Sequence, residues 1–374
     1  MLDLERQYAP LREELLEALA GVLDSRQFIL GDAVAAFERS AAEQLGVAHA
    51  VGCSSGTDAL WLALAAAGIG PGSAVITSPF SFFASVSSIL RAGATPVLAD
   101  IDPATFNLSP AAVEAVLEGP GAREIRAVLP VHLYGQCASF SGFGQDRRLT
   151  IIEDAAQAWG AEWKGKKAGS LGDIAAFSFY PTKNLSAAGD AGMVATNSAS
   201  LAERAGMLRQ HGMRRRYYHD EPGWNARMDG FQGAVLAVKL RYIEGWTEAR
   251  RLVAARYDAL FRAAGLAERS PYPGKGVVLP REVQGARHVW HQYVIRAPRR
   301  DALRDFLSAR QIGSEIYYPV PLHMQKALAG LGYKEGDFPE AERAAREVLA
   351  LPIFPELRED EQQTVVAAIA EFLS

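Results

Sequence analysis

The chain has 374 residues, of which 49% are hydrophobic and 22% charged, and its formal net charge is -4. A chain of this length and composition can bury a large core, and we expect two domains. The small acidic excess argues against general binding to nucleic acid or to an anionic membrane. Cys53 and Cys137 are the only cysteines, which argues against a disulfide framework and indicates a reducing cytoplasm.

The N-terminal segment, residues 1–23, is acidic and amphipathic. It lacks the basic start and apolar core of a signal peptide. The chain contains no run of about 18 uninterrupted apolar residues, so we expect no membrane span and a cytoplasmic location.

Residues 49–70 form a pattern of a short strand, a small polar turn and an amphipathic helix. Backbone N–H groups and hydroxyls at the start of a helix suit a phosphate group. The residues that would supply them are Ser54, Ser55, Gly56 and Thr57. An ordinary capped helix is the alternative for this motif, because it matches neither the Walker loop nor the dinucleotide fingerprint.

Strand and helix patterns alternate from about Ala48 to Thr196. Such alternation predicts an α/β fold with a mostly parallel sheet and helices on both faces. Ligands in this fold class bind at the carboxyl ends of the strands.

Two residues near such strand ends carry a specific chemistry. Asp154 closes the apolar run LTII, and Lys183 follows the strand-like run IAAFSF and precedes a loop of small residues. A carboxylate for a ring nitrogen and an amine for an aldehyde are what a pyridoxal phosphate enzyme needs. Lys183 would hold the cofactor as a Schiff base. Most lysines are instead solvated, as we expect for Lys164, Lys166 and Lys167 on what looks like a polar hairpin.

The second half of the chain mixes strand and helix patterns. We expect one long helix over residues 230–265, a strand in WHQYVIRA, a helix at 301–311 and a final helix from about Glu359. The domain boundary is placed along the first of these helices. The prediction is a large α/β domain, residues 1–240, with an N-terminal helical segment, and a small α+β domain, residues 241–374.

Histidines and arginines offer two further candidate sites. His288 and His291 lie on a predicted strand, which would send them to opposite faces, so we expect no metal site. The arginine run at residues 214–216 precedes Tyr217 and Tyr218. Most such runs are solvated, but guanidinium groups beside aromatic rings could also bind the diphosphate and base of a nucleotide sugar.

Twelve short motifs, in order along the chain, resemble the DegT/DnrJ/EryC1/StrS family of sugar aminotransferases, a branch of the fold type I pyridoxal phosphate enzymes. They are LDLERQYAPL, FILGDAVAAFE, SSGTDALWLAL, SPFSFFAS, DIDPATFNLSP, PVHLYGQ, EDAAQAWGA, SFYPTKNL, GDAGMV, GWNARMDGFQGAVLAVKL, YYPVPLH and LPIFPEL.

The resemblance assigns roles to individual residues. It implies that Lys183 forms the Schiff base, that Asp154 pairs with the pyridine nitrogen and that Gln157 binds the phenolic oxygen. Phe82 would stack on the ring, with its neighbour Phe83 as the alternative. The implied phosphate contacts are Gly56, Thr57, Ser178 and, from the neighbouring subunit, Asn225. Tyr318 and His323 resemble residues at the sugar end of the pocket. Tyr217, next to the arginine run, is a third candidate for a substrate contact.

The implied activity is transfer of an amino group, with glutamate as the expected donor, to a keto group of a nucleotide-linked sugar by a homodimer with shared sites. The loops of this chain resemble those of family members that aminate C3 of a hexose. Alternatives are a C4-specific enzyme, a related enzyme acting on a non-sugar ketone, and a regulatory protein without catalysis. Ser55 stands where relatives often have asparagine. Some family members have histidine in place of the Schiff-base lysine and perform dehydration, and Lys183 argues against that chemistry here.

Overall fold

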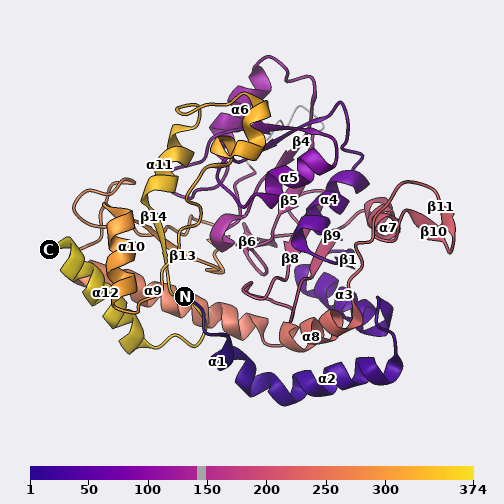
Figure 1. The fold of residues 1–374 in the computed structure, drawn as a ribbon, viewed down its shortest axis with the longest axis horizontal. Coiled ribbons are helices and arrows are strands. Elements are labelled where there is room, and N and C mark those ends of the chain that lie inside the picture. The colour runs from indigo at the N-terminus through magenta and orange to yellow at the C-terminus, as the bar shows by residue number, and fades with distance from the viewer. Residues whose placement is uncertain (141–148) are drawn as a thin grey trace.

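The computed structural model describes residues 1–140 and 149–374, and a seven-stranded sheet forms its centre (Figure 1). In spatial order the strands are β1 (His49–Cys53), β9 (Gly192–Thr196), β8 (Ile174–Ser178), β5 (Thr150–Asp154), β4 (Ile125–Leu129), β2 (Ala74–Thr77) and β3 (Thr95–Leu98). The strands from β8 to β3 pair in parallel, and β9 is antiparallel to both of its neighbours. This arrangement confirms the predicted α/β class with a mostly parallel sheet.

Helices cover both faces of the sheet, as the side-chain alternation of β8 shows. Ile174 and Ala176 pack in one hydrophobic cluster and Ala175 and Phe177 in another. The helices of the first face are α4 (Gly56–Ala66), α5 (Ala84–Arg91) and α7 (Ala199–Leu208), and those of the second are α3 (Gly31–Leu45) and α8 (Gly230–Leu240). Successive residues of a strand point to opposite faces, so a strand buried on both sides is apolar throughout.

The remaining elements lie around this centre. They are α1 (Leu4–Tyr8), α2 (Arg12–Ser25), α6 (Pro110–Glu118), α9 (Ile243–Ala263), α10 (Arg300–Ala309), α11 (Pro339–Glu347) and α12 (Glu359–Leu373), with the strand pair β13 (Tyr293–Arg296) and β14 (Val348–Leu351). Small sheets are formed by β10 (Met213–Arg215) with β11 (Tyr218–His219), and by β6 (Glu162–Trp163) between β7 (Lys166–Lys167) and β12 (Ala286–Arg287). Among residues 1–140 and 149–374, no helix is long and apolar enough to cross a membrane.

Two expected elements differ from the structure. The single helix predicted over residues 230–265 is two helices, since α8 ends at Leu240 and α9 begins at Ile243. The predicted strand WHQYVIRA begins only at Tyr293, because Trp290 adopts a positive φ of 48° that interrupts an extended backbone. The break between α8 and α9 lies where the domain boundary was placed, and the division itself stays a prediction.

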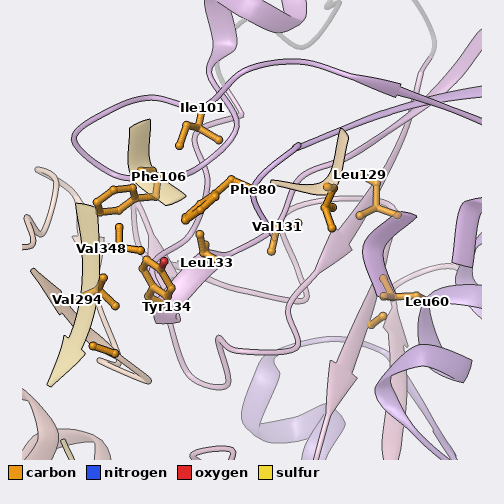
Figure 2. Close-up of a cluster of buried hydrophobic side chains, with 14 of the residues drawn as sticks. Leu60, Phe80, Ile101, Phe106, Leu129, Val131, Leu133, Tyr134, Val294 and Val348 are labelled. Atoms are coloured by element: carbon orange, nitrogen blue, oxygen red, sulfur yellow. The ribbon is translucent and has the colours of Figure 1, made fainter. Parts of the chain in front are cut away.

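One hydrophobic cluster runs from the sheet into the C-terminal elements (Figure 2). Phe80, Phe106 and Tyr134 belong to it, as do Val294 of β13 and Val348 of β14. The N-terminus is also bound to the C-terminal part, since Arg6 donates to both carboxylate oxygens of Glu361 at 2.9 and 2.7 Å. The C-terminal elements are therefore held against the carboxyl-end loops of the sheet.

Candidate active site

The carboxyl ends of β5 and β8 bring Asp154 and Lys183 to the same edge of the sheet. The two strands pair in parallel, with Asp154 opposite Ala176, and Lys183 lies in the turn that follows β8. Asp154 is 4% exposed. Its Oδ2 accepts a 2.7 Å hydrogen bond from Ser85 Oγ, and its Oδ1 accepts one of 3.2 Å from the Ala156 N–H. The carboxylate is thus buried but fixed in direction.

Burial has opposite effects on the two groups. It raises the pKa of Asp154, against the hydrogen bonds from Ser85 and Ala156 and the charge of Lys183, all of which lower it. It lowers the pKa of Lys183 to about 8, against the charge of Asp154, which raises it. An amine with a pKa near 8 can be a nucleophile and can exchange protons near neutral pH.

The start of α4 lies directly against the end of β8. A Cβ atom on Gly56 would be 2.5 Å from Ser178 Cβ, so this contact requires glycine. Ser55 caps the helix by accepting a 3.1 Å hydrogen bond from the Asp58 N–H. The first N–H groups of a helix have no partner within it, so those of Gly56 and Thr57 remain for a ligand beside the Ser178 hydroxyl.

Aromatic residues form another side of the site. Phe82 is 59% exposed, whereas Phe83, the alternative for the stacking role, packs against the hydrophobic cluster. The Phe82 ring lies 6.3 Å from that of Tyr318, centroid to centroid. Gln157 donates to Tyr318 Oη at 3.1 Å and accepts from the Tyr134 N–H at 2.6 Å. Gln157, Phe82 and Tyr318 therefore form one contiguous group.

Three predicted site residues have their contacts elsewhere. The Asn225 side chain is exposed, and its Oδ1 accepts from Arg227 Nε at 3.0 Å. Tyr217 is 75% exposed, in the β10–β11 hairpin that projects from the body of the molecule (Figure 1). His323 is 3% exposed, and its Nε2 lies 3.0 Å from Glu342 Oε1, so its ring supports the fold and presents no open face.

Several residues that support the site were not identified from the sequence. Glu153 is fully buried, and its carboxylate accepts from the N–H groups of Gly169, Leu171 and Gly172 and lies 2.8 Å from His132 Nε2. An acid inside an apolar run is the signal that could have identified Glu153, because a buried carboxylate needs hydrogen-bond or charge partners. No local pattern identified Ser85, which comes from another element.

The side chain next to Lys183 is hydrogen-bonded to the segment before β13. Asn184 donates to the Val289 carbonyl at 2.9 Å, and its Oδ1 lies 3.2 Å from His291 Nδ1. Burial, and secondarily the charge of Lys183, holds the pKa of His291 well below its ordinary value. Within the described parts of the chain, no group of three or more histidine, cysteine or acidic residues could hold a metal ion.

The residues present fit pyridoxal phosphate, since a fixed buried carboxylate, an amine of lowered pKa and an open helix start meet at one sheet edge. This fold and this site define a fold type I pyridoxal phosphate-dependent transferase. Residues 10–370 match the model of the DegT/DnrJ/EryC1/StrS aminotransferase family, to which this chain belongs. The resemblance, the cofactor and the aminotransferase class predicted from the sequence are confirmed.

Known proteins are similar to this chain over its whole length, among them three with 41% to 50% identity. A pleiotropic regulatory protein of Geobacillus stearothermophilus is 50% identical, covering 100% of this chain and 98% of its own. The UDP-N-acetyl-3-dehydro-alpha-D-glucosamine 3-aminotransferase of Acidithiobacillus ferrooxidans is 42% identical, covering 100% and 97%. The crystal structure of S. venezuelae DesV in complex with a ketimine intermediate has 41% identity and a TM-score of 0.93, covering 100% and 97%.

Proposed function

We propose that this aminotransferase moves an amino group from glutamate to C3 of a nucleotide-linked 3-keto-hexose. The observation that carries the proposal is the convergence of Asp154 and Lys183 at the carboxyl ends of β5 and β8. The name of the A. ferrooxidans relative supports both a nucleotide sugar and the C3 position.

Each residue of the site has a part in this chemistry. Bound pyridoxal phosphate supplies an aldehyde that captures amines and a ring that takes up electrons. Lys183 Nζ removes the proton from the α-carbon of the donor and, in the second half of the reaction, delivers a proton to the sugar carbon that receives nitrogen. Asp154 would supply the negative charge that pairs with the ring nitrogen, and Ser85 keeps that carboxylate oriented. Phe82 would stack on the ring with its exposed aromatic face.

We further propose that the site is completed in a cytoplasmic homodimer. Asn225 and the hairpin that carries Tyr217 are exposed on the single chain, which leaves them available to a second copy. In this arrangement Asn225 reaches the phosphate of the neighbouring site, and Tyr217 lies near the nucleotide.

A second candidate function comes from the 50% identical relative, which is named a regulatory protein. A purely regulatory role would not need the amine and the carboxylate, yet both Lys183 and Asp154 are in place. The remaining alternatives, C4 amination or a non-sugar ketone, would use the same cofactor residues and different loops.

Position-specific amination tests the proposal. The cofactor-loaded protein is incubated with glutamate and, separately, with matched 3-keto and 4-keto nucleotide sugars, and the new C–N bond is located by NMR. We expect an amine at C3, and none with Lys183→Ala. Exclusive amination at C4 would overturn the position, and no amination of either sugar would overturn the nucleotide-sugar assignment.

A further inference from the structure

A cavity of about 520 Å³ lies between the loop after β3 and the C-terminal part of the chain, and its lining includes none of the residues assigned to the active site. The loop contributes Pro103, Ala104 and Phe106, and the other walls come from residues within 262–281 and from β13. A volume of this size is within the range of small-molecule sites, which is about 300–1,000 Å³.

Most of the charged side chains that line the cavity are arginines. The charged residues of its lining are Arg262, Arg269, Arg281, Arg296 and Glu268. Glu268 is the one acidic residue of this lining, and its Oε1 accepts a 2.7 Å hydrogen bond from the Gly276 N–H. The lining therefore contains four arginines and one glutamate.

Two of these arginines are free to bind a ligand. Arg262 is paired with Asp258 at 2.8 Å and Arg296 with Glu347 at 2.7 Å. Arg269 and Arg281 are exposed, and neither is in an ion pair with any residue in the described parts of the chain. Arg281 also lines neighbouring cavities of about 340 and 330 Å³.

Arg296 is a buried arginine of the cavity lining, paired with Glu347. Its side chain is 1% exposed and donates to the Pro103 carbonyl at 3.1 Å. Its guanidinium lies 5.7 Å from the ring centroid of Phe106 and 5.1 Å from that of Tyr272. Because Phe106 and Val294 also line the cavity, the site combines cationic groups with an apolar wall.

We propose that this cavity binds an organic phosphate, at a site separate from that of Lys183. Guanidinium groups bind phosphate oxygens through paired hydrogen bonds, and the apolar wall suits the organic part of such a ligand. The proposal does not depend on the sugar or on the amination position.

The cavity is also connected to the active site by hydrogen bonds. Gln136 Nε2 donates to the Arg281 carbonyl at 3.1 Å, and Gln136 Oε1 accepts from the Val283 N–H at 2.8 Å. Two residues before Gln136, the Tyr134 N–H donates to Gln157 at 2.6 Å. The backbone of Arg281 is therefore hydrogen-bonded to the segment that contains Tyr134.

Pyrophosphate is the probe, added to the cofactor-loaded protein and measured by isothermal titration calorimetry at low and moderate salt. We expect one cavity site per chain, binding that weakens with salt, and at least a tenfold loss of affinity in the Arg269→Ala/Arg281→Ala double variant. Arg123→Ala, which removes an exposed arginine outside the cavity, is the matched control and should bind as the wild type does. Unchanged affinity in the double variant, or no binding by the wild type, would overturn the proposal.

Hydrogen–deuterium exchange then locates the ligand. Protection of peptides covering residues 262–281 supports the cavity. Protection confined to peptides around residues 54–57 and 178–183 would place pyrophosphate at the active site and would overturn the proposal. Neither measurement uses turnover, so failure of the proposed amination leaves this test intact.

Discussion

At the scale of single residues, burial gives common side chains an uncommon chemistry. Lys183 differs from the exposed Lys164 and Lys166 in its surroundings, which lower its pKa to about 8. Asp154 keeps its place in the interior through hydrogen bonds that Ser85 and Ala156 donate to it. Desolvation disfavours the charged form of each. The hydrogen bonds from Ser85 and Ala156 oppose this effect for Asp154, and the charge of Asp154 opposes it for Lys183.

Replacing Lys183 by alanine removes the amine that carries protons in the proposed reaction. We expect kcat to fall by at least about 10²–10⁴-fold, the usual worth of general acid–base catalysis, while the protein still folds and binds cofactor through its other contacts. Steady-state kinetics and cofactor content measure both effects. Lys164→Ala, on the exposed hairpin, is the control, and equal activity in the two variants would refute the role of Lys183.

Asp154→Asn keeps the shape of the side chain and removes its charge. We expect a strong fall in kcat with weaker cofactor binding, because the ring nitrogen loses the group that keeps it protonated. Ser85→Ala should have a smaller effect, equivalent to about 1.5–3 kcal/mol for one hydrogen bond to a charged group. Measured kcat values and pH–rate profiles test both predictions. If Asp154→Asn had the kcat and the pH–rate profile of the wild type, the functional carboxylate would lie elsewhere.

At the scale of elements, the site depends on close contacts between segments that are far apart in the sequence. The start of α4 touches the end of β8 through Gly56 and Ser178. The loop after Lys183 is held by Lys239 of α8, whose buried Nζ lies 2.5 Å from Ser186 Oγ and 3.1 Å from Tyr8 Oη. Changes in these contacts therefore alter the site without removing a reacting group.

Gly56→Ala tests the first of these contacts. The added Cβ would lie 2.5 Å from Ser178 Cβ, so one backbone segment must move. We expect a loss of about 1–3 kcal/mol in the free energy of unfolding, typical of overpacking, and weaker retention of cofactor after dialysis. Gly206→Ala in α7, where nothing lies within 4 Å of the new atom, should be neutral or stabilising. A stable Gly56→Ala protein with full cofactor content would contradict the role of this contact.

Lys239 makes stability depend on pH in a defined direction. Burial lowers its pKa to about 7 from an ordinary 10.5, so between these values the unfolded chain holds a proton that the folded chain has released. Stability therefore rises with pH across this window, by up to about 1.4 kcal/mol for each pH unit from this group.

Lys239→Met removes the titrating amine and should flatten that rise. Urea unfolding at pH 7, 8 and 9, at a fixed protein concentration, compares the variant with the wild type. Lys275→Met, at an exposed lysine, should keep the wild-type slope. Parallel pH curves for the wild type and Lys239→Met would show that the buried amine does not titrate in this window.

At the scale of the whole molecule, the C-terminal elements and the sheet form a continuous interior. Phe80 and Phe106 from the loops of the sheet pack in the same cluster as Val294 and Val348 of the β13–β14 pair (Figure 2). The site lies on the sheet side of this junction, and the arginine-lined cavity is formed where the two parts meet. Asn225 and Tyr217 of the β10–β11 hairpin are exposed, and the proposed dimer would use them to complete the site of the second copy.

Subunit exchange tests the proposed dimer. A Lys183→Ala protein and an Asn225→Ala protein are each expected to be inactive or nearly so. Mixing them should restore activity, because hybrid dimers contain one site with both residues intact and one site with neither. Native mass spectrometry confirms exchange, and hybrids without recovered activity would show that Asn225 serves its own chain or has no part in the site.

The sequence by itself determined the features that depend on neighbouring residues. The alternation of strands and helices, the start of α4 at Gly56 and the positions of Asp154 and Lys183 near strand ends all follow from local patterns and short motifs. Local patterns did not reveal the break between α8 and α9, since the apolar spacing continues across Arg241 and Tyr242.

Only the tertiary structure decided which distant groups surround the reactive ones. Ser85 reaches Asp154 across sequence-distant elements, His323 turns toward Glu342 in the interior, and Gly56 contacts Ser178. Burial and hydrogen bonding depend on packing between such elements, and pKa values depend on burial. A chain can therefore encode an amine and a carboxylate in recognisable motifs, while their lowered and raised pKa values arise only once the fold encloses them.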